Sequence, residues 1–251
     1  MTDSWTPPLT LEEKLKQTLV PPGYYIRSLY RRECRKGERE INLVPYLAQK
    51  SKISLDIGAN KGVYSYAMLP HSAAVHAFEP NPKALDVLKR WGKDTLTIHD
   101  IALSNASGEA TLSVPKGSKG AGYSNQGSTL RDLDREHGSL SVKTLKLDDL
   151  NLSKVGFMKI DVEGFEKQVL EGAKETLQRE RPNLLIEIEE KHTGTRLEDE
   201  IAGVCAYGYD CFALAGGALT PFAAIDLEKH HRNPAKRADY VFNFIFLPKA
   251  A

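Results

Sequence analysis

The feature that most constrains this chain is an apolar segment that runs into a glycine turn and is followed, one segment later, by a lone acid. Residues 53–57 are Ile-Ser-Leu-Asp-Ile, the turn spans Gly58 to Gly62, and the next apolar segment ends at Glu79. Glycines let backbone approach a ligand, a helix that begins at the turn favours an anionic group, and a carboxylate after the second strand can accept hydrogen bonds from ribose hydroxyls. The pattern predicts an α/β protein with a nucleoside-cofactor site.

The spacing of these glycines separates the possible cofactors. A dinucleotide fingerprint has the form Gly-x-Gly-x-x-Gly, in which the second glycine makes room for a pyrophosphate. Here Gly58 and Gly62 enclose Ala59, Asn60 and Lys61, and the phosphate loop Gly-x-x-x-x-Gly-Lys-Ser/Thr is absent. A turn with fewer glycines suits the amino-acid end of S-adenosyl-L-methionine (SAM), which we expect as the cofactor. A nicotinamide or flavin nucleotide and a purely structural turn are the alternatives.

Composition narrows the class of protein further. The 251 residues fit one domain with a short appendage, and the net charge of +1 argues against a nucleic-acid partner. No apolar run approaches the roughly 20 residues that span a bilayer, and the N-terminus does not resemble a secretory signal. Three scattered cysteines, Cys34, Cys205 and Cys211, suit a reducing cytoplasm and lack metal-ligand spacing. We expect a cytoplasmic protein without a transmembrane segment; its oligomeric state stays open.

Segments typical of strands and helices alternate after the first fifty residues. We expect an N-terminal helical extension over 1–50 and one domain over 51–251. Predicted strands lie near 53–57, 74–78, 96–102, 156–161 and 184–189, and predicted helices near 60–69, 82–91, 165–179 and 195–206. Two further strand-like segments, 209–214 and 240–247, have no predicted helix between them. The sequence therefore predicts a doubly wound, mostly parallel seven-stranded sheet that ends in an antiparallel pair, the Rossmann-like architecture typical of class I SAM-dependent methyltransferases.

Two segments depart from this alternation. Residues 105–150 form a β insertion whose ends, 109–114 and 140–147, are strand-like, and a glycine-rich stretch over 116–128 lies between them. That stretch predicts either a substrate-gating loop or a merely flexible one. In the extension, Thr10 and Glu13 predict a capping box for a helix that Pro21-Pro22 stops. The basic, tyrosine-bearing residues 24–35 predict an amphipathic helix packed on the core or, alternatively, a lid or substrate contact.

Five segments occur together in an order that resembles a known family. They are residues 56–65 (Asp-Ile-Gly-Ala-Asn-Lys-Gly-Val-Tyr-Ser), 78–82 (Phe-Glu-Pro-Asn-Pro), 102–108 (Ala-Leu-Ser-Asn-Ala-Ser-Gly), 158–166 (Met-Lys-Ile-Asp-Val-Glu-Gly-Phe-Glu) and 185–189 (Leu-Ile-Glu-Ile-Glu). Over about residues 53 to 247 the chain resembles FkbM-type SAM-dependent methyltransferases, and the fourth segment is the most specific. The resemblance implies methyl transfer to a hydroxyl oxygen of a sugar or polyketide. It implies nothing for residues 1–50.

The glycine turn should hold the methionine end of the cofactor. We expect the backbone N–H groups of Gly58, Ala59 and Asn60 to meet its carboxylate. Gly62 should permit close packing of helix against strand. Asp56 should order the turn or contact the cofactor's ammonium group.

The nucleoside end should lie beyond the second and third strands. Glu79, followed by Pro80, should accept hydrogen bonds from both ribose hydroxyls, with a helix-cap role as the alternative. Asp100, Ile101 and Ala102 end the third strand, next to the expected position of the adenine. Asp100 either accepts from the adenine amine or only forms a turn.

Catalysis should centre on Asp161, which ends the fourth strand at the crevice where sheet order reverses. A positioned general base contributes about 10²–10⁴-fold to such a methyl transfer, and the candidates are Asp161, Glu163, Glu187, Glu189 and His192. Asp161 is the first choice by topology, although it could instead steady the sulfonium or the ammonium. The same acids could supply oxygen ligands to a divalent cation. We expect no metal, because a helix should cover one face of these strands.

The leading hypothesis is a SAM-dependent O-methyltransferase acting on a sugar, glycolipid or other small molecule. An N-methyltransferase of nucleic acid or protein is less favoured, because Asp161-Val-Glu-Gly stands where such enzymes have Asn/Asp-Pro-Pro-Tyr/Phe. A nicotinamide-dependent oxidoreductase would need a third glycine in the turn, and a non-catalytic SAM-binding module would differ only in activity. The basic run over 229–237, in the last hairpin, is either a solvated turn or a contact to a phosphate-bearing or acidic acceptor.

Overall fold

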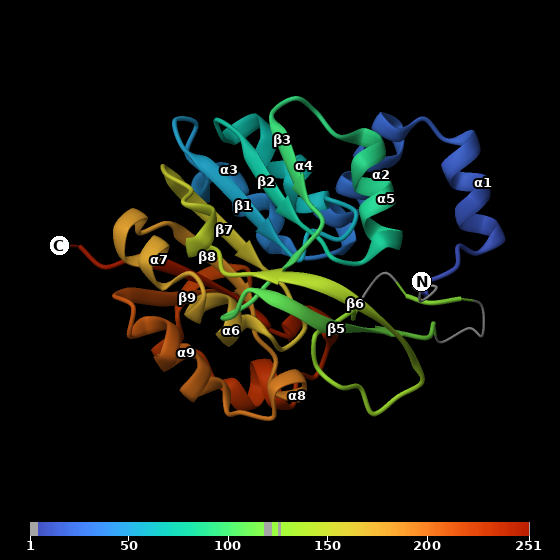
Figure 1. The fold of residues 1–251 in the computed structure, drawn as a ribbon. Coiled ribbons are helices and arrows are strands. Elements are labelled where there is room, and N and C mark those ends of the chain that lie inside the picture. Colours follow the sequence, from blue (N-terminus) through green and yellow to red (C-terminus); the bar gives the residue numbers. More distant parts are fainter. Residues whose placement is uncertain (1–4, 118–121, 125–126, 251) are drawn as a thin grey trace.

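A central eight-stranded sheet dominates the computed structural model, which describes residues 5–117, 122–124 and 127–250 (Figure 1). The strands lie in the order β10-β9-β11-β8-β7-β1-β2-β3. Their bounds are β1 Ile53–Ile57, β2 Val75–Phe78, β3 Leu96–His99, β7 Val155–Ile160, β8 Asn183–Glu187, β9 Tyr209–Ala215, β10 Ala218–Pro221 and β11 Asn243–Pro248. Strands β3, β2, β1, β7 and β8 are mutually parallel, whereas β11 runs antiparallel to β8 and β9. The predicted doubly wound sheet with an antiparallel C-terminal pair is confirmed.

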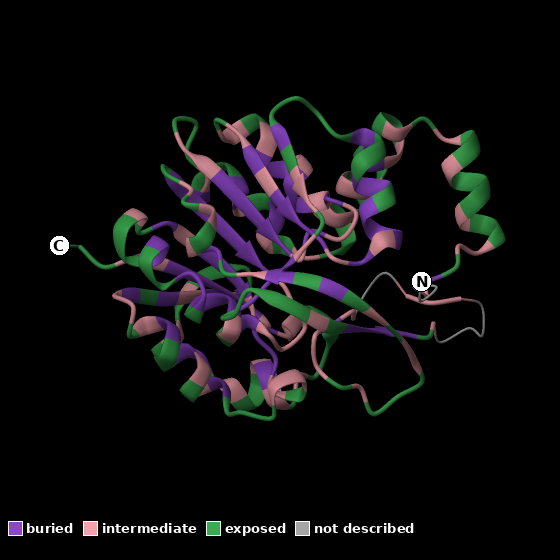
Figure 2. Ribbon diagram, viewed as in Figure 1, coloured by how far each residue is buried: buried purple, intermediate pink, exposed green. Residues whose placement is uncertain are grey.

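Helices cover both faces of this sheet, so that its strands are buried between two layers (Figure 2). One layer consists of α2 Pro22–Lys36, α3 Val44–Leu47, α4 Val63–Met68 and α5 Pro82–Trp91. The other consists of α6 Glu166–Glu171, α7 Lys174–Glu180 and α9 Leu197–Cys205. Helices α1 Leu11–Leu19 and α8 Glu190–Thr193 bury no side chain fully. Within the described residues, no helix is both long and apolar enough to cross a membrane.

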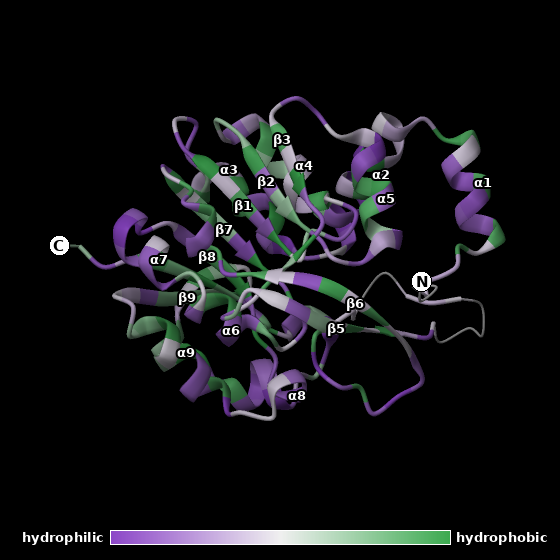
Figure 3. Ribbon diagram, in the orientation of Figure 1, coloured by the Kyte–Doolittle hydropathy of each residue, from purple (hydrophilic) through white to green (hydrophobic). Residues whose placement is uncertain are grey.

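Local signals fix several helices where the sequence predicts them. Helix α5 begins because the Asn81 side chain accepts a hydrogen bond from the Lys83 N–H at 3.0 Å and Pro82 occupies the first helical position. Its Leu88 and Trp91 are buried against the sheet. Figure 3 shows that hydrophobic residues are concentrated in the strands of the central sheet, whereas hydrophilic residues are frequent on the helices and loops around it. In α1, the predicted capping box of Thr10 and Glu13 is present.

The N-terminal segment packs on the core and also reaches the edge of a large cavity. Ile26 of α2 and Ile41 of the 3₁₀ turn η1, Arg39–Leu43, are buried in one cluster with α4 and α5. Residues 32–40 line the cavity. Both predictions for this segment, a helix packed on the core and a substrate contact, are therefore compatible with its position.

The predicted third strand, 96–102, is wrong in its second half. Strand β3 ends at His99, the chain bends, and β4 Ala102–Leu103 joins a separate three-stranded sheet with β5 Gly108–Pro115 and β6 His137–Leu145. Strands β5 and β6 form the predicted antiparallel pair of the insertion. In the glycine-rich stretch between them, residues 118–121 and 125–126 lie outside the described residues, so the expectation of a gating loop is not tested there.

The C-terminal region holds one strand more than the seven predicted. Gly216 and Gly217, with φ values of 60° and 85°, form a two-residue turn that pairs β10 with β9. Such turns need positive φ at both positions, which glycine adopts readily. The expectation that no helix lies between β9 and β11 is also wrong. That connection contains two 3₁₀ turns, Phe222–Ala224 and Arg237–Asp239, and the π-helical segment Glu228–Arg232, which includes most of the basic run.

The predicted helix over 165–179 is interrupted. Helix α6 ends at Glu171 and α7 begins at Lys174. The backbone carbonyl of Ser104 lies where a Cβ on Gly172 would stand, so Gly172 lets the insertion approach this helix closely. The contact ties the three-stranded sheet to the second helical layer.

Candidate functional site

A cavity of about 950 Å³ lies where the carboxyl ends of β1, β2, β7 and β8 meet the N-terminal segment and the insertion. Order in the sheet reverses between β1 and β7, the position at which open α/β sheets bind ligands. The cavity falls within the usual range for small-molecule sites, roughly 300–1,000 Å³. Among the residues that the structure describes, eight with carboxyl side chains line it: Glu33, Glu38, Glu40, Glu79, Asp161, Glu163, Glu187 and Glu189.

The glycine turn shapes one wall of this cavity. Gly58 has a φ of 80°, and a Cβ there would strike the backbone carbonyl of Asp161. The N–H groups of Gly58 and Ala59 both donate to the Phe78 carbonyl at 3.0 Å, and the Asn60 N–H donates to Glu79. Each of these three N–H groups thus donates a hydrogen bond within the protein, and their predicted contact with the carboxylate of the cofactor stays a prediction. Gly58 and Asn60 line the cavity, whereas Ala59 is buried in the core.

Glu79 lies between the turn and helix α5, and its side chain is held from both sides. Its Oε2 accepts from the Asn60 N–H and its Oε1 from the Asn81 N–H, each at 2.7 Å. Burial raises the pKa of Glu79 to about 7, although both N–H donors lower it. Glu79 and Pro80 line the cavity, so a fixed carboxylate faces the space where the sequence predicts the ribose.

Asp56 and Gly62 support the turn from behind. The Asp56 Oδ2 accepts from the N–H and the hydroxyl of Ser65, at 2.7 and 2.5 Å, and thereby caps the start of α4. Asp56 is buried and does not line the cavity, so ordering the turn is the predicted role that its contacts support. At Gly62, a Cβ would meet the side chains of Leu88 and Trp91. This glycine therefore permits close contact with helix α5. The sequence had predicted that it would permit close packing against a strand instead.

Of the three residues predicted beside the adenine, two line the cavity. They are Ile101, in the bend that follows β3, and Ala102, the first residue of β4. Asp100 does not line it: its exposed carboxylate lies 3.6 Å from the Lys89 ammonium, on the surface. A contact from Asp100 to the adenine is thus not supported, and its alternative role in forming a turn stays a prediction.

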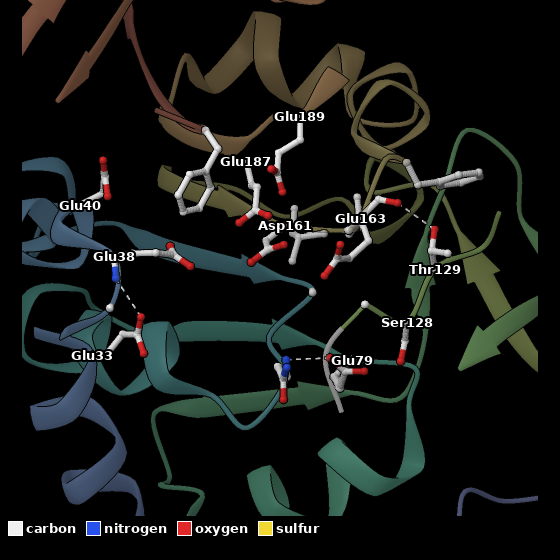
Figure 4. A pocket seen from close by; sticks show the side chains of 18 of the residues that line it. Glu33, Glu38, Glu40, Glu79, Ser128, Thr129, Asp161, Glu163, Glu187 and Glu189 are labelled. Carbon is white, nitrogen blue, oxygen red and sulfur yellow. Dashed lines mark hydrogen bonds between the residues drawn. The ribbon is translucent and has the colours of Figure 1, made fainter. Parts of the chain in front are cut away.

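Four acids gather at the ends of β7 and β8 (Figure 4). In this view Glu38 extends from the N-terminal segment toward Asp161, Glu163 lies on the opposite side of Asp161, and Glu187 reaches toward it from above. Burial raises the pKa of Glu187 to about 10, with the neighbouring Asp161 as the second cause, and it raises the pKa of Asp161 as well. Burial and the charges of Asp161 and Glu189 raise the pKa of Glu163 to about 7. The site therefore favours an added positive charge.

Glu163 is held in an unusual backbone conformation. Its φ is 55°, which is uncommon for a residue other than glycine and clusters at functional sites. The Thr129 hydroxyl of the insertion donates to its carbonyl at 3.0 Å. On the other side, the buried Glu166 carboxylate accepts from the N–H groups of Val162 and Gly164. These contacts direct the Glu163 side chain into the cavity.

Lys159 is a cation buried beneath this acidic group. Its Nζ donates to Asn243 Oδ1 at 3.1 Å, lies 3.6 Å from Asp161 Oδ2, and stands over the Tyr64 ring. Tyr64 and Asn243 in turn both donate to Glu38 Oε2, at 2.8 and 3.0 Å. Burial alone would lower the pKa of Lys159, but Asp161 and Glu38 together keep it raised. Lys159 thus connects Asp161 to the N-terminal segment.

His192 of α8 lies behind the acids rather than on the cavity wall. Its Nδ1 is 3.4 Å from Glu163 Oε2 and 3.7 Å from Glu189 Oε1. Burial lowers the pKa of His192, while Glu189 opposes this. The structure therefore brings together Asp161, Glu187 and Glu163 and places His192 next to them.

Two groups of side chains have the composition of a cation site. Within each group the ligand-type atoms lie within 4.8 Å of one another: Glu163, Glu187 and His192 in one, and Glu38, Asp161 and Glu187 in the other. Oxygen and imidazole donors of this kind suit a divalent cation. The argument that a covering helix would keep these acids apart is wrong, because their side chains meet in the cavity.

Three residues of the site, Glu38, Lys159 and Tyr240, were not predicted from the sequence. Glu38 stands in the charged run 37–40, which carries no signal of a site. The Tyr240 hydroxyl donates to Glu189 from a loop distant in the sequence. Only Lys159 had a readable signal, because a lysine inside the apolar strand Val155–Ile160 must be paired once buried.

Comparison with known proteins places the chain in a family. A family model for the methyltransferase FkbM domain matches residues 56–211. The chain is 29% identical over 161 residues to hexuronic acid methyltransferase AglP of Haloferax volcanii, a match that covers 61% of this chain and 63% of that protein. It is 27% identical over 156 residues to 2-O-methyltransferase NoeI of Sinorhizobium fredii, covering 55% of this chain and 64% of that protein. The matches thus span less than two thirds of either relative.

A solved structure shows the same fold. The crystal structure of Methyltransferase FkbM from Methylobacillus flagellatus superposes with a TM-score of 0.51 at 16% identity, over 79% of this chain and 44% of that chain. The family model spans more than half of the sequence and includes the glycine turn, Glu79 and the acids at the ends of β7 and β8. This chain belongs to the FkbM methyltransferase domain family.

Proposed function

We propose that this protein is a SAM-dependent methyltransferase that methylates a hydroxyl oxygen of a sugar or sugar-containing acceptor. The single observation that carries the proposal is the cavity itself. A buried carboxylate, Glu79, ends β2 on one side of it, and the acidic group around Asp161 ends β7 and β8 on the other. A nucleoside that also carries a positive charge is the ligand that satisfies both.

The residues present fit such a cofactor. The lone pairs of Glu79 that its two N–H donors leave unused can accept hydrogen bonds from ribose hydroxyls. Ile101 and Pro80 offer apolar contact for a purine ring nearby. When bound, SAM supplies an electrophilic methyl group on a positively charged sulfur. Asp161, whose pKa burial raises, stabilises that charge and is itself stabilised in the ionised form.

Glu163 is the general base that the geometry favours. It lines the cavity, and burial raises its pKa to about 7, close to the value at which a base is most effective near neutrality. It takes the proton from the acceptor hydroxyl, and His192, 3.4 Å away, can pass that proton on. Glu187, with a pKa raised to about 10 by burial, stays protonated and can donate a hydrogen bond to the acceptor.

The names of the curated relatives support a sugar acceptor. One is named a hexuronic acid methyltransferase and the other a 2-O-methyltransferase. A sugar hydroxyl is a weak nucleophile until its proton is removed, which is consistent with a base of raised pKa beside the acidic group.

The experiment is methyl transfer from isotopically labelled SAM to a panel of neutral sugars, uronic acids and glycolipids. The proposal expects label in a hydroxyl ether of at least one sugar-containing acceptor, and none with Glu163→Gln. Transfer to nitrogen of a protein or nucleic acid, or hydride exchange with a nicotinamide nucleotide in place of methyl transfer, would overturn it.

A further inference from the structure

We propose that the outer face of helix α2 binds an anionic group, a phosphate or diphosphate, that forms part of the acceptor; this inference rests on the proposed function. A groove of about 380 Å³ follows that face. Five cations of α2 line it: Arg27, Arg31, Arg32, Arg35 and Lys36. The hydroxyl-bearing side chains of Tyr24 and Ser28 complete the groove.

The concentration of charge on α2 is not balanced by the protein. The helix has these five cations and one acid, Glu33, whereas the whole chain carries a net charge of only +1. Glu33 is already used, since its carboxylate accepts from the Glu38 N–H at 2.9 Å. Among residues 5–117, 122–124 and 127–250, no carboxylate lies within ion-pair distance of the five cations. Cations spaced four residues apart destabilise a helix, and an anionic ligand would relieve that repulsion.

The groove and the cavity are neighbours. Arg32, Arg35 and Lys36 line both, so a group bound on the outer face of α2 would lie next to the entrance of the cavity. Guanidinium groups match phosphate oxygens in two-point hydrogen bonds. A phosphate group held in the groove would therefore anchor an acceptor whose far end lies in the cavity.

The distribution of charge fixes the direction of such an acceptor. The carboxyl groups of Asp161, Glu163 and Glu189 line the interior of the cavity and disfavour an anion there. A neutral, hydroxyl-bearing sugar suits that interior, and the anionic part suits the basic edge. The geometry thus points to an acceptor in which a sugar is joined to phosphate, either as a soluble sugar phosphate or as a lipid-linked one.

Calorimetric titration with inorganic diphosphate, at saturating S-adenosylhomocysteine (SAH), tests the inference. We expect the unmodified protein to bind diphosphate and Arg27→Glu/Arg31→Glu to bind it at least roughly tenfold more weakly, since neither arginine lines the cavity. The control Lys167→Glu/Lys174→Glu changes net charge equally, at exposed positions of α6 and α7. It should leave diphosphate binding unchanged. Equal binding by all three proteins, or none by the unmodified protein, would overturn the inference.

Two further measurements distinguish a lipid phosphate from a soluble sugar phosphate and separate this inference from the proposed function. Flotation with phosphatidylcholine vesicles, with and without phosphatidic acid, tests a lipid phosphate. Binding only to the anionic vesicles, lost in Arg27→Glu/Arg31→Glu, would assign the anion to a lipid, whereas binding of diphosphate alone would assign it to a soluble sugar phosphate. SAH affinity is measured separately for each variant. If the unmodified protein does not bind SAH, the proposed function is contradicted. If it binds SAH but not diphosphate, only this inference is contradicted.

Discussion

The ammonium of Lys159 lies 3.6 Å from the carboxylate of Asp161, beneath the floor of the cavity, although Lys159 itself is almost wholly buried. The two residues are separated by one position on β7, so their side chains leave the same face of the sheet. Through Tyr64 and Asn243 the same lysine is linked to Glu38 of the N-terminal segment. The positive charge of Lys159 offsets the repulsion among the neighbouring carboxylates, so that these acids can lie close together in the folded protein.

Replacing Lys159 by methionine should destabilise the protein because Asp161 and Glu38 lose their buried counter-charge. We expect a loss of roughly 2–4 kcal/mol near neutral pH, at the lower end of what breaking a buried ion pair costs. The loss should shrink at acidic pH, because burial raises the pKa of Asp161 and its protonation removes the unpaired charge. Urea unfolding of Lys159→Met at neutral and at acidic pH measures this. The exposed control Lys167→Met should change stability by less than about 0.5 kcal/mol. An equal, small effect of both substitutions would show that the Lys159 contacts contribute little.

Replacing Glu163 by glutamine should abolish turnover while leaving the affinity for SAH intact. A positioned base contributes about 10²–10⁴-fold, and glutamine keeps the shape without the basic group. In the unmodified enzyme the rate should rise with pH through about 7, because Glu163, whose pKa burial raises to about 7, becomes active only when ionised. Initial rates measured across pH give the turnover and its pH dependence, and calorimetry gives the SAH affinity. A Glu163→Gln enzyme with full activity, or one with an unchanged pH profile, contradicts the assignment.

Replacing Gly58 by alanine should destabilise the fold by about 2 kcal/mol or more. The residue has a φ of 80°, in the left-handed region that costs an alanine roughly 1–2 kcal/mol, and the new Cβ would strike the Asp161 carbonyl. Gly203→Ala on α9 is the matched control, since a Cβ there has nothing within 4 Å and should stabilise the helix by about 0.4–1 kcal/mol. Thermal unfolding of the two variants should move in opposite directions. A Gly58→Ala protein as stable as the parent would mean that the turn can relax.

The preference for SAM over SAH should increase with pH. Burial raises the pKa of both Glu79 and Glu163 to about 7, so these groups are largely neutral below that value and negative above it. SAM and SAH share the ribose that Glu79 is proposed to bind, but only SAM carries the positive sulfur, so only SAM gains the added attraction to the ionised acids. Between about pH 6 and about pH 8 the ratio of the two affinities should rise by roughly tenfold, the equivalent of one pKa unit. Competitive titration at both pH values gives the ratio, and a ratio that stays constant or falls would contradict an electrostatic role for these acids.

Local signals predicted much of the fold, and contacts between distant residues account for what they missed. Helix α5 was predicted at its observed bounds because Asn81, Pro82 and the apolar spacing act within one segment. The use of the Gly58 and Ala59 N–H groups by the Phe78 carbonyl depends on how two strands pair, which the sequence does not reveal. The contact between Glu38 and Asn243 joins opposite ends of the chain and is equally invisible. The Gly216-Gly217 turn, by contrast, carried a readable hairpin signal that the analysis did not use.

Calorimetric titration of SAH into the unmodified protein and into Glu79→Gln tests the central claim most directly. The account predicts tight binding to the unmodified protein and a loss of about 1.5–3 kcal/mol in Glu79→Gln, the usual value of hydrogen bonds to a charged group. The circular dichroism of the variant should stay that of a folded protein, and the exposed control Glu109→Gln on β5 should bind SAH normally. Unchanged affinity in a folded Glu79→Gln, or binding of NAD(H) or NADP(H) in place of SAH, would contradict it.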